Sequence, residues 1–448
     1  MDIIVGDRYS TTPEMKALPI IRQICRARPE GFYHMPKYRS GMWDGYISLM
    51  RGLKEFPTGL LSLVVNGLEK AGWEVNVIDN TVVLPHRHIL VDSLHGIKLR
   101  DYQHEAAETM TNYRRGVAGM ATNSGKTEVV AAILWSLYLP QTVVIVHRKE
   151  LMYQTARRLE KRLGCKVGIY GDGVKSKKNI TVAMIQTLAR DKKIDFTGNQ
   201  VVISDECHHL SSNQMMDIMF KIPGSYRYGF SGTPLKYEVL ADMKLAAATG
   251  DILCTTSNAF LVKEGYSAVP KVYVHVVESY DVDEWELDYQ SAYDKLIVNG
   301  EVRNKLITKL AKESKGLVLI LVNRIEHGKI LTDLLPNSVF VSGNDEAEYR
   351  NSVLDRMRTG DPGVFIATPI YDEGIDVPAV DTIVLAAGGK SHVKLLQRIG
   401  RGLRKKEDKE NILTVHDFLD DTNMYLLEHS HERADTYASE KFETIVVK

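Results

Sequence analysis

The segment from Gly119 to Thr127 carries residues that suit phosphate binding. It reads Gly-Met-Ala-Thr-Asn-Ser-Gly-Lys-Thr, follows a short apolar strand-like stretch, and opens a helix-like one. Backbone N–H groups in such a loop and at a helix N-terminus point toward an anion. Lys126 is therefore predicted to reach the β- and γ-phosphates of ATP, and Thr127 to offer its hydroxyl to Mg²⁺. The rest of the predicted loop is Asn123, Ser124 and Gly125.

This loop departs from the strict phosphate-loop pattern at one position. The pattern places its first glycine at position 120, where this chain has Met120. Because of this departure, an alternative hypothesis stays open: the chain binds nucleic acid as a clamp or scaffold and does not hydrolyse nucleotide.

A second acidic site follows about 80 residues later. The apolar stretch Val201–Ser204 reads as a strand and ends in Asp205 and Glu206, followed by Cys207 and His208. Asp205 is predicted to hold Mg²⁺, and Glu206 to polarise the attacking water as a general base. Cys207 and His208 are adjacent and have no second ligand pair at zinc-site spacing, so zinc is not expected.

Short motifs across residues 99–404 appear in the order found in superfamily-two helicases, and the chain resembles that family. The matching segments are Leu99–Gln103, Gly119–Thr127, Asp205–His208, Ser231–Pro234, Thr368 with Glu373–Pro378, and Gln397–Arg404. The resemblance implies that Gln103, with Arg100 beside it, contacts adenine, and that Gly374 and Asp376 also belong to the nucleotide site. It also implies that the Ser231–Pro234 segment couples hydrolysis to the nucleic-acid track.

The Gln397–Arg404 segment fits a role across a cleft from the phosphates. Gln397, Arg401 and Arg404 are spaced i, i+4 and i+7, so they lie on one side of a helix. Arginines placed in this way can offset the charge that builds on the γ-phosphate, an effect often worth about 10³–10⁵ in rate. We expect ATP to sit between two lobes that close on binding and open after hydrolysis.

Nucleic acid is expected to lie across both lobes, held through its phosphates. Polar groups at loop tips suit contact that does not depend on base sequence. The candidates from the helicase-like motifs are Arg148, Gln186 and Thr187 in the first lobe and Arg324 and Thr368 in the second.

The first block of the chain resembles, more narrowly, the phage UvsW-type branch-migration helicases. The resemblance lies in Phe32-Tyr33, Pro36–Arg39 and Gly41–Gly45, and Gly265–Pro270 is similar to the end of the first lobe in that group and in XPB-like motors. It implies action on forks, D-loops and four-way junctions, with 3′-to-5′ polarity. Lys37 and Arg39 could contact phosphates while Trp43 stacks on a base. The alternative is that these aromatic residues simply form the core of a small module.

The order of the expected elements defines the fold class. Residues 1–92 mix helices and strands, including strands at 73–78 and 81–84. From about residue 93, short apolar strands alternate with helices, and the rhythm restarts near residue 300, which predicts parallel sheets covered on both faces. We therefore expect an α/β protein: an N-terminal α+β module that binds DNA (1–92) and two tandem RecA-like lobes, one with the ATP site (93–275) and one with the arginine fingers (276–448).

Composition indicates how the chain attracts nucleic acid and in which cell compartment it works. Of 448 residues, 57 are Lys or Arg and 57 are Asp or Glu, so bulk charge does not attract nucleic acid and a local basic track must do so. The four cysteines are far apart and no apolar stretch is long enough to span a membrane, which favours a reducing interior such as the cytoplasm, that of the host if the protein is phage-encoded. Replication or recombination proteins are possible partners, and a monomer is favoured.

The first hypothesis is an ATP-dependent DNA helicase or translocase that remodels branched DNA, binding it independently of sequence. The other hypotheses are a duplex translocase that does not separate strands, an RNA helicase, and the non-catalytic clamp. The motor motifs do not separate RNA from DNA, because they bind the backbone. An intact set of Lys126, Thr127, Asp205, Glu206, Arg401 and Arg404 opposes the clamp.

Overall fold

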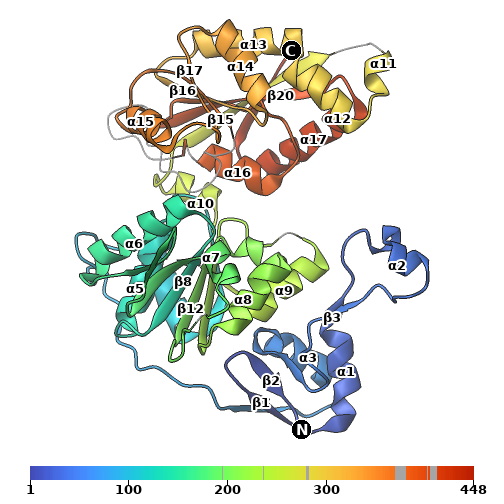
Figure 1. Ribbon diagram of the computed structural model, residues 1–448, viewed down its shortest axis with the longest axis vertical. Coiled ribbons are helices and arrows are strands. Elements are labelled where there is room, and N and C mark those ends of the chain that lie inside the picture. Colours follow the sequence, from blue (N-terminus) through green and yellow to red (C-terminus); the bar gives the residue numbers. More distant parts are fainter. Residues whose placement is uncertain (194, 236, 279–281, 369–379, 401, 404–410) are drawn as a thin grey trace. The chain divides into compact units, whose positions relative to one another are not determined.

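The computed structural model describes residues 1–193, 195–235, 237–278, 282–368, 380–400, 402–403 and 411–448. The chain forms two compact units, Met1–Thr256 and Ser257–Lys448. Figure 1 shows helices packed on both sides of the large sheet in each unit. Among the described residues, no helix has the length and apolar character needed to cross a bilayer.

The N-terminal module has a small sheet of its own, in the order β5-β2-β1-β6. Strands β1 and β6 are parallel, and the other pairs are antiparallel. Helix α3 buries Val64 and Leu68, one turn apart, against Ile21 of α1 and Ile3 of β1. The elements are β1 (Asp2–Val5), β2 (Tyr9–Thr11), η1 (Met15–Ala17), α1 (Leu18–Ile24), β5 (Glu55–Pro57), η3 (Thr58–Leu60), α3 (Leu61–Lys70) and β6 (Asn76–Asp79).

A long excursion leaves this module between two short strands, and we call it the finger (residues 28–46). Strands β3 (Arg26–Ala27) and β4 (Ile47–Ser48) pair antiparallel and close its base. The finger carries η2 (Phe32–His34) and α2 (Pro36–Arg39), and Figure 1 shows α2 lying well away from α1 and α3.

The module is not separate from the first lobe, because the two share one hydrophobic core. A Cβ at Gly59 would lie only 2.0 Å from the carbonyl oxygen of Ala246 in α9, so the module sits directly on the backbone of that helix. The Tyr9 ring stacks on that of Phe220, with centroids 4.9 Å apart. We therefore describe the module and the first lobe as parts of one unit.

The first lobe is built on a sheet in the order β10-β9-β11-β8-β12-β13-β7-β14, parallel except for the β9–β10 pair. Its strands are β7 (Arg115–Met120), β8 (Thr142–Val146), β9 (Gly168–Gly171), β10 (Val174–Ser176), β11 (Ile180–Met184), β12 (Val201–Asp205), β13 (Tyr226–Ser231) and β14 (Ile252–Thr256). Its helices are α4 (Asp101–Asn112), α5 (Lys126–Ser136), α6 (Lys149–Leu163), α7 (Ile185–Arg190), η4 (Cys207–Ser211), α8 (Asn213–Lys221) and α9 (Val239–Thr249).

Parallel pairing brings the ends of the central strands together. Asp205 pairs with Phe230, and Ser231 pairs with Gly119, so β12, β13 and β7 end at one edge of the sheet. Strands β8 and β11 end at the same edge, at Val146 and Met184. The motifs that follow these strands are thereby gathered at a single edge.

The second unit is built on a parallel sheet in the order β17-β18-β16-β19-β20-β15-β21. Its strands are β15 (Val269–Glu278), β16 (Leu317–Leu321), β17 (Val339–Val341), β18 (Gly363–Ala367), β19 (Thr382–Val384), β20 (Ile412–Asp421) and β21 (Glu443–Val447). Its helices are α10 (Asn258–Lys263), α11 (Val282–Trp285), α12 (Tyr289–Ala292), η5 (Tyr293–Val298), α13 (Glu301–Glu313), α14 (Ile325–Leu334), α15 (Ala347–Arg358), α16 (His392–Gly400) and α17 (Met424–Ser439).

Two sequence expectations about these elements need correction. The boundary between the lobes was expected at 275/276, but β15 pairs along its whole length with β20, so the second unit begins before that strand, at Ser257. The strand expected at 81–84 does not form. Residues 81–99, which we call the strap, instead run as irregular chain along the first lobe, where Leu84 N–H donates to the Tyr226 hydroxyl at 3.0 Å.

Candidate nucleotide site and nucleic-acid track

The predicted phosphate loop joins the end of β7 to the start of α5. Gly125 has a φ of +83°, a conformation that favours glycine. A Cβ there would lie 2.3 Å from Nε2 of Gln103, so the side chain of α4 occupies that space. The loop therefore has the glycine-dependent shape that a phosphate cradle requires, and Lys126 and Thr127 open α5 directly behind it.

Gln103 holds this loop in place. Its Nε2 donates to the Ser124 carbonyl at 2.8 Å, and its Oε1 accepts from the Arg100 N–H at 3.0 Å. The Tyr102 hydroxyl donates to the same Ser124 carbonyl at 2.7 Å. The contact of Arg100 and Gln103 with adenine stays a prediction. In addition, Gln103 has a structural role, because its hydrogen bonds position the loop.

Met120 does not disturb the loop. It is the last residue of β7, and its side chain is completely buried in the core. The difference from glycine at this position therefore falls on the strand, not on the residues that curve around the phosphate position. This removes the observation that supported a non-catalytic clamp.

Asp205 ends β12, and Glu206 follows it with a φ of +48°, a left-handed backbone that turns its side chain toward the loop. Lys126 Nζ donates to Glu206 Oε1 at 3.3 Å, and both side chains are largely buried. A cation of the phosphate loop and the predicted general base are thus direct partners.

The charges in this cluster shift one another's pKa values. Burial alone would raise the pKa of Glu206, but the charges of Lys126, His208 and His147 and the hydrogen bond from Lys126 together outweigh burial, and the pKa is lowered. Burial alone would lower the pKa of Lys126, and the carboxylates of Glu206 and Asp205 raise it instead. The pKa of Asp205 is raised by burial and by the charge of Glu206. A divalent cation at Asp205 would favour its ionised form.

The site continues from Glu206 toward the end of β13. His208 Nδ1 lies 3.4 Å from Glu206 Oε2 and 2.9 Å from Ser231 Oγ. Ser231 Oγ also accepts the Thr233 N–H at 3.1 Å. These contacts join the acidic segment Asp205–His208 to the Ser231–Pro234 segment. His208 and Ser231 are both buried, so the contacts between them are screened from water.

Replacing Ser231 with alanine tests this connection. The change removes a buried hydroxyl but leaves Lys126, Asp205 and Glu206 in place, and a buried partner left unsatisfied costs about 1–3 kcal/mol. We expect stimulation of hydrolysis by DNA to fall about tenfold, with hydrolysis in the absence of DNA changed much less. Equal losses with and without DNA would contradict a coupling role, and Ser231→Thr, which keeps the hydroxyl, should restore coupling.

The predicted contacts to nucleic acid in the first lobe gather beside this site. Gln186 Nε2 donates to the His147 carbonyl at 2.8 Å, which joins the start of α7, directly after β11, to the segment that follows β8. The His147 ring lies 4.7 Å from that of His209, next to His208. Arg148 is half-buried at the start of α6, and Thr187 is half-buried in α7. Their binding of nucleic acid stays a prediction.

In the second unit, polar residues gather at the ends of β16 and β19. The Arg398 guanidinium donates to Asn323 Oδ1 at 2.7 Å, and both line a pocket of about 310 Å³ together with Lys394. Arg324 lies 3.9 Å from Asp294 and is about half exposed. Thr368 and Gln397 are buried, and Gln397 Oε1 has no hydrogen-bond partner among the described residues. Gly374, Asp376, Arg401 and Arg404 lie outside the described residues.

The finger holds the predicted N-terminal contacts. Arg28 lies over the rings of Phe32 and Tyr46, and the Phe32 ring meets that of Tyr38 edge-on at 4.8 Å. A Cβ at Gly45 would lie 2.8 Å from the Phe32 ring, so this cluster depends on that glycine. The finger therefore keeps its shape through arginine–aromatic contacts of its own.

The roles of the predicted finger residues differ. Trp43 is half-buried and its Nε1 donates to the Tyr46 carbonyl at 2.8 Å, so this side chain closes a turn. Arg39 is exposed but donates to the Tyr33 carbonyl at 3.3 Å, and Lys37 is exposed. The large side chains most exposed in the finger are those of Tyr33 and Met42.

Sequence reasoning did not select several residues that the geometry brings into the site. Tyr102, His208 and Ser231 contact the predicted residues directly, yet none was assigned a contact role of its own. Tyr102 stands beside Gln103, and His208 and Ser231 stand within matched motifs, so adjacency to a motif was the available signal.

Two family models match the chain. The model for the Type III restriction enzyme res subunit matches residues 96–236, and the helicase conserved C-terminal domain matches residues 301–406. A putative HsdR subunit of a type I restriction enzyme from Vibrio vulnificus has a similar fold, with a TM-score of 0.59 at 19% identity, covering 81% of this chain and 70% of that one. The two family models give the class: the chain is an ATP-hydrolysing helicase, and it resembles the helicases of superfamily two.

Within that class the chain resembles one phage protein over nearly its full length. The ATP-dependent DNA helicase uvsW of Enterobacteria phage T4 is 25% identical over 480 aligned positions, covering 95% of this chain and 94% of that protein. The DNA 3'-5' translocase XPB2 of Sulfurisphaera tokodaii is 28% identical, covering 71% of this chain and 81% of that protein. The likeness to uvsW thus extends into the N-terminal module.

Proposed function

We propose that this ATP-dependent DNA helicase or translocase remodels branched DNA, and that the finger engages the branch point. The observation that carries the motor chemistry is the continuous line of contacts from Lys126 through Glu206 and His208 to Ser231. This line joins the residues that would act on ATP to the segment that would sense nucleic acid.

The residues present suit ATP and Mg²⁺. ATP, when bound, supplies the phosphoanhydride that is cleaved, and the phosphate loop with Lys126 provides N–H donors and a cation for its phosphates. Thr127 and Asp205 offer the oxygen ligands that Mg²⁺ prefers. Glu206, whose pKa is lowered, is ionised at neutral pH and can accept a proton from water.

The ion pair between Lys126 and Glu206 affects both ATP binding and hydrolysis. As long as Lys126 Nζ is held by Glu206, neither group is available for its role in hydrolysis. Binding of phosphates must draw Lys126 away and release the carboxylate for water. We propose that this exchange of partners keeps hydrolysis low until nucleotide is fully seated.

The remaining motor residues complete the proposal. We infer that Gln397, Arg401 and Arg404 act on the γ-phosphate from the second lobe, and that Gly374 and Asp376 contribute to the nucleotide site. DNA phosphates would be held by Arg148, Gln186 and Thr187 in one lobe and by Arg324 and Thr368 in the other. Partners among replication or recombination proteins, and a monomeric state, stay predictions.

The finger supports branched DNA as the substrate. Tyr33 and Met42 present 56% and 78% of their surface to solvent, although both are large apolar side chains. Lys37 and Arg39 are exposed beside them. Base pairs that lose a stacking neighbour at a branch point expose flat faces on which such side chains can stack, and the flanking phosphates pair with the cations. A smooth duplex offers no exposed base faces, so this surface favours a junction.

Hydrolysis rates with different nucleic acids test the proposal. At fixed salt, we expect a four-way junction to stimulate ATP hydrolysis more than single-stranded DNA, duplex DNA or structured RNA does. Stimulation by RNA alone would make the protein an RNA helicase. Stimulation by duplex DNA without strand displacement would make it a duplex translocase.

A finger variant separates branch recognition from the motor. Replacing both Tyr33 and Met42 with alanine should raise the junction concentration needed for half-maximal stimulation by about 5–150-fold, because the one aromatic stacking contact, that of Tyr33, is worth about 1–3 kcal/mol. Stimulation by single-stranded DNA should hardly change. Tyr113→Ala, an equally exposed tyrosine of the first lobe, is the matched control. An unchanged junction response would exclude the finger from branch recognition.

A further inference from the structure

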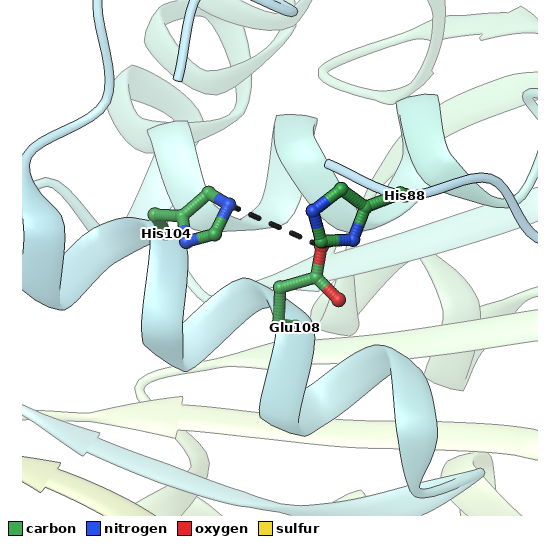
Figure 2. Close-up of side chains that lie close together, drawn as sticks. All are labelled: His88, His104 and Glu108. Atoms are coloured by element: carbon green, nitrogen blue, oxygen red, sulfur yellow. Dashed lines mark ion pairs between the residues drawn. The ribbon is translucent and has the colours of Figure 1, made fainter. Parts of the chain in front are cut away.

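Three metal-ligating side chains meet where the strap crosses α4. His104 and Glu108 are one turn apart on that helix, and His88 comes from the strap. Figure 2 shows the carboxylate of Glu108 pointing between the two imidazole rings. His88 Nδ1 lies 3.0 Å from Glu108 Oε1, and His104 Nε2 lies 4.0 Å from the same oxygen. We propose that these residues bind a divalent transition-metal ion of the Zn²⁺ class.

The donor set and spacing suit such an ion. Two imidazoles and one carboxylate are ligands that zinc accepts, with the fourth position left to water. The candidate ligand atoms all lie within 4.8 Å of one another. Tetrahedral ligands about 2.0–2.1 Å from zinc are roughly 3.3 Å apart, so the atoms need to move by only about an ångström. Magnesium is not expected, because it prefers oxygen ligands.

The groups also have partners without a metal, and these define what must change. His104 Nε2 donates to the Ile89 carbonyl at 2.7 Å, and the Ile89 N–H donates to Glu108 Oε1 at 2.7 Å. Metal binding requires the proton on His104 Nε2 to move to the other ring nitrogen, and the bond to the Ile89 carbonyl is lost. The Ile89 N–H can stay on Glu108, because a carboxylate has further lone pairs for the metal.

The position of the site indicates a structural role for the ion. The strap links the N-terminal module to the first lobe, and next to His88 the Arg87 guanidinium lies over the Trp135 ring of α5 at 3.4 Å. Helix α4 begins with the residues that hold the phosphate loop, including Gln103. An ion bound by His88, His104 and Glu108 would cross-link the strap to that helix. It would stabilise the first unit without taking part in hydrolysis.

Zinc titration of the full chain tests this site. The metal-stripped protein, free of any histidine tag, is titrated calorimetrically with Zn²⁺ while excess Mg²⁺ occupies the site at Asp205. We expect one Zn²⁺ per chain and a higher unfolding temperature when Zn²⁺ is present. His88→Ala should weaken binding by about tenfold or more and remove the thermal shift, as loss of a ligand exceeds the loss of a supporting contact. His88 is mostly exposed, so this variant should fold.

Two further variants keep the result clear. Glu108→Gln keeps an oxygen acceptor for the Ile89 N–H but loses the charge, so it should bind Zn²⁺ weakly without losing the fold. His431→Ala, an exposed histidine on α17, should bind Zn²⁺ like the unmodified protein. A Co²⁺-loaded sample should lack the thiolate charge-transfer band that binding at cysteine would give. The proposal would be overturned if the unmodified protein did not bind Zn²⁺ stoichiometrically. It would also be overturned if His88→Ala and Glu108→Gln bound Zn²⁺ as tightly as the unmodified protein does.

Discussion

Replacing Glu206 with glutamine should leave ATP bound but uncleaved, with the hydrolysis rate lowered by about 10²–10⁴-fold. Glutamine has the size and shape of glutamate but cannot accept a proton from water. In the unmodified protein the pKa of Glu206 is lowered, so its carboxylate is ionised at neutral pH and can act as a base once Lys126 has moved to the phosphates. The variant also loses the ion pair at 3.3 Å, which frees Lys126 for the phosphates. Affinity for ATP should therefore stay the same or rise.

Two measurements on this variant decide the role of Glu206. Single-turnover hydrolysis reports the chemical step, and equilibrium binding of ATP reports the ground state. Glu69→Gln, at an exposed position of α3, is the matched control and should behave as the unmodified protein. Normal turnover by Glu206→Gln would remove this residue from the mechanism, and weak ATP binding would indicate a disturbed loop instead.

Lys126→Ala should abolish measurable ATP hydrolysis, with a loss of at least about 10²–10³-fold for one charged donor at the phosphates. The side chain is the cation that opens α5, and its charge is secured by the raised pKa that Glu206 and Asp205 produce. Unlike Glu206→Gln, this variant should also bind ATP more weakly, because the lysine contacts phosphate in the ground state. The two variants therefore differ in binding while both fail in hydrolysis.

This prediction needs a check on folding, because Lys126 is largely buried and its removal leaves Glu206 without its partner. The far-ultraviolet spectrum and unfolding temperature should be close to those of the unmodified protein. Lys70→Ala, an exposed lysine at the end of α3, is the matched control. Hydrolysis at the normal rate by a folded Lys126→Ala chain would show that the phosphate site lies elsewhere.

The residues of the nucleotide site could be found in the sequence because each lies next to a local signal. Gly125, Lys126 and Thr127 are consecutive, and Asp205 and Glu206 end an apolar run. The alternation of strands and helices also predicted the parallel sheets of both lobes, and β12 lies where the stretch Val201–Ser204 predicted a strand. Local spacing is enough for such features, because hydrogen bonding within an element depends on neighbours in the chain.

The domain boundaries could not be predicted in this way. Apolar and polar residues alternate along β15, as is typical of a strand, but alternation does not say which sheet the strand joins. The strap contains apolar residues suited to a strand, yet its donors and acceptors are taken by side chains of the first lobe, including Tyr226 and Glu108. Whether a segment forms a strand, and which sheet that strand joins, depends on the partner surface that is available. That surface is formed by residues far away in the chain.

By itself, the sequence determined the two-lobe α/β class and predicted the phosphate loop and the acidic residues Asp205 and Glu206, because these follow from residue types at short spacing. Only the tertiary structure decided that Lys126 meets Glu206 across 80 residues, that Trp43 closes a turn, and that His88 joins His104 and Glu108. Parallel strand order brings Lys126 to Glu206, and the course of the strap over α4 brings His88 to His104 and Glu108. Proximity in the fold, unlike a motif, leaves no regular spacing in the chain.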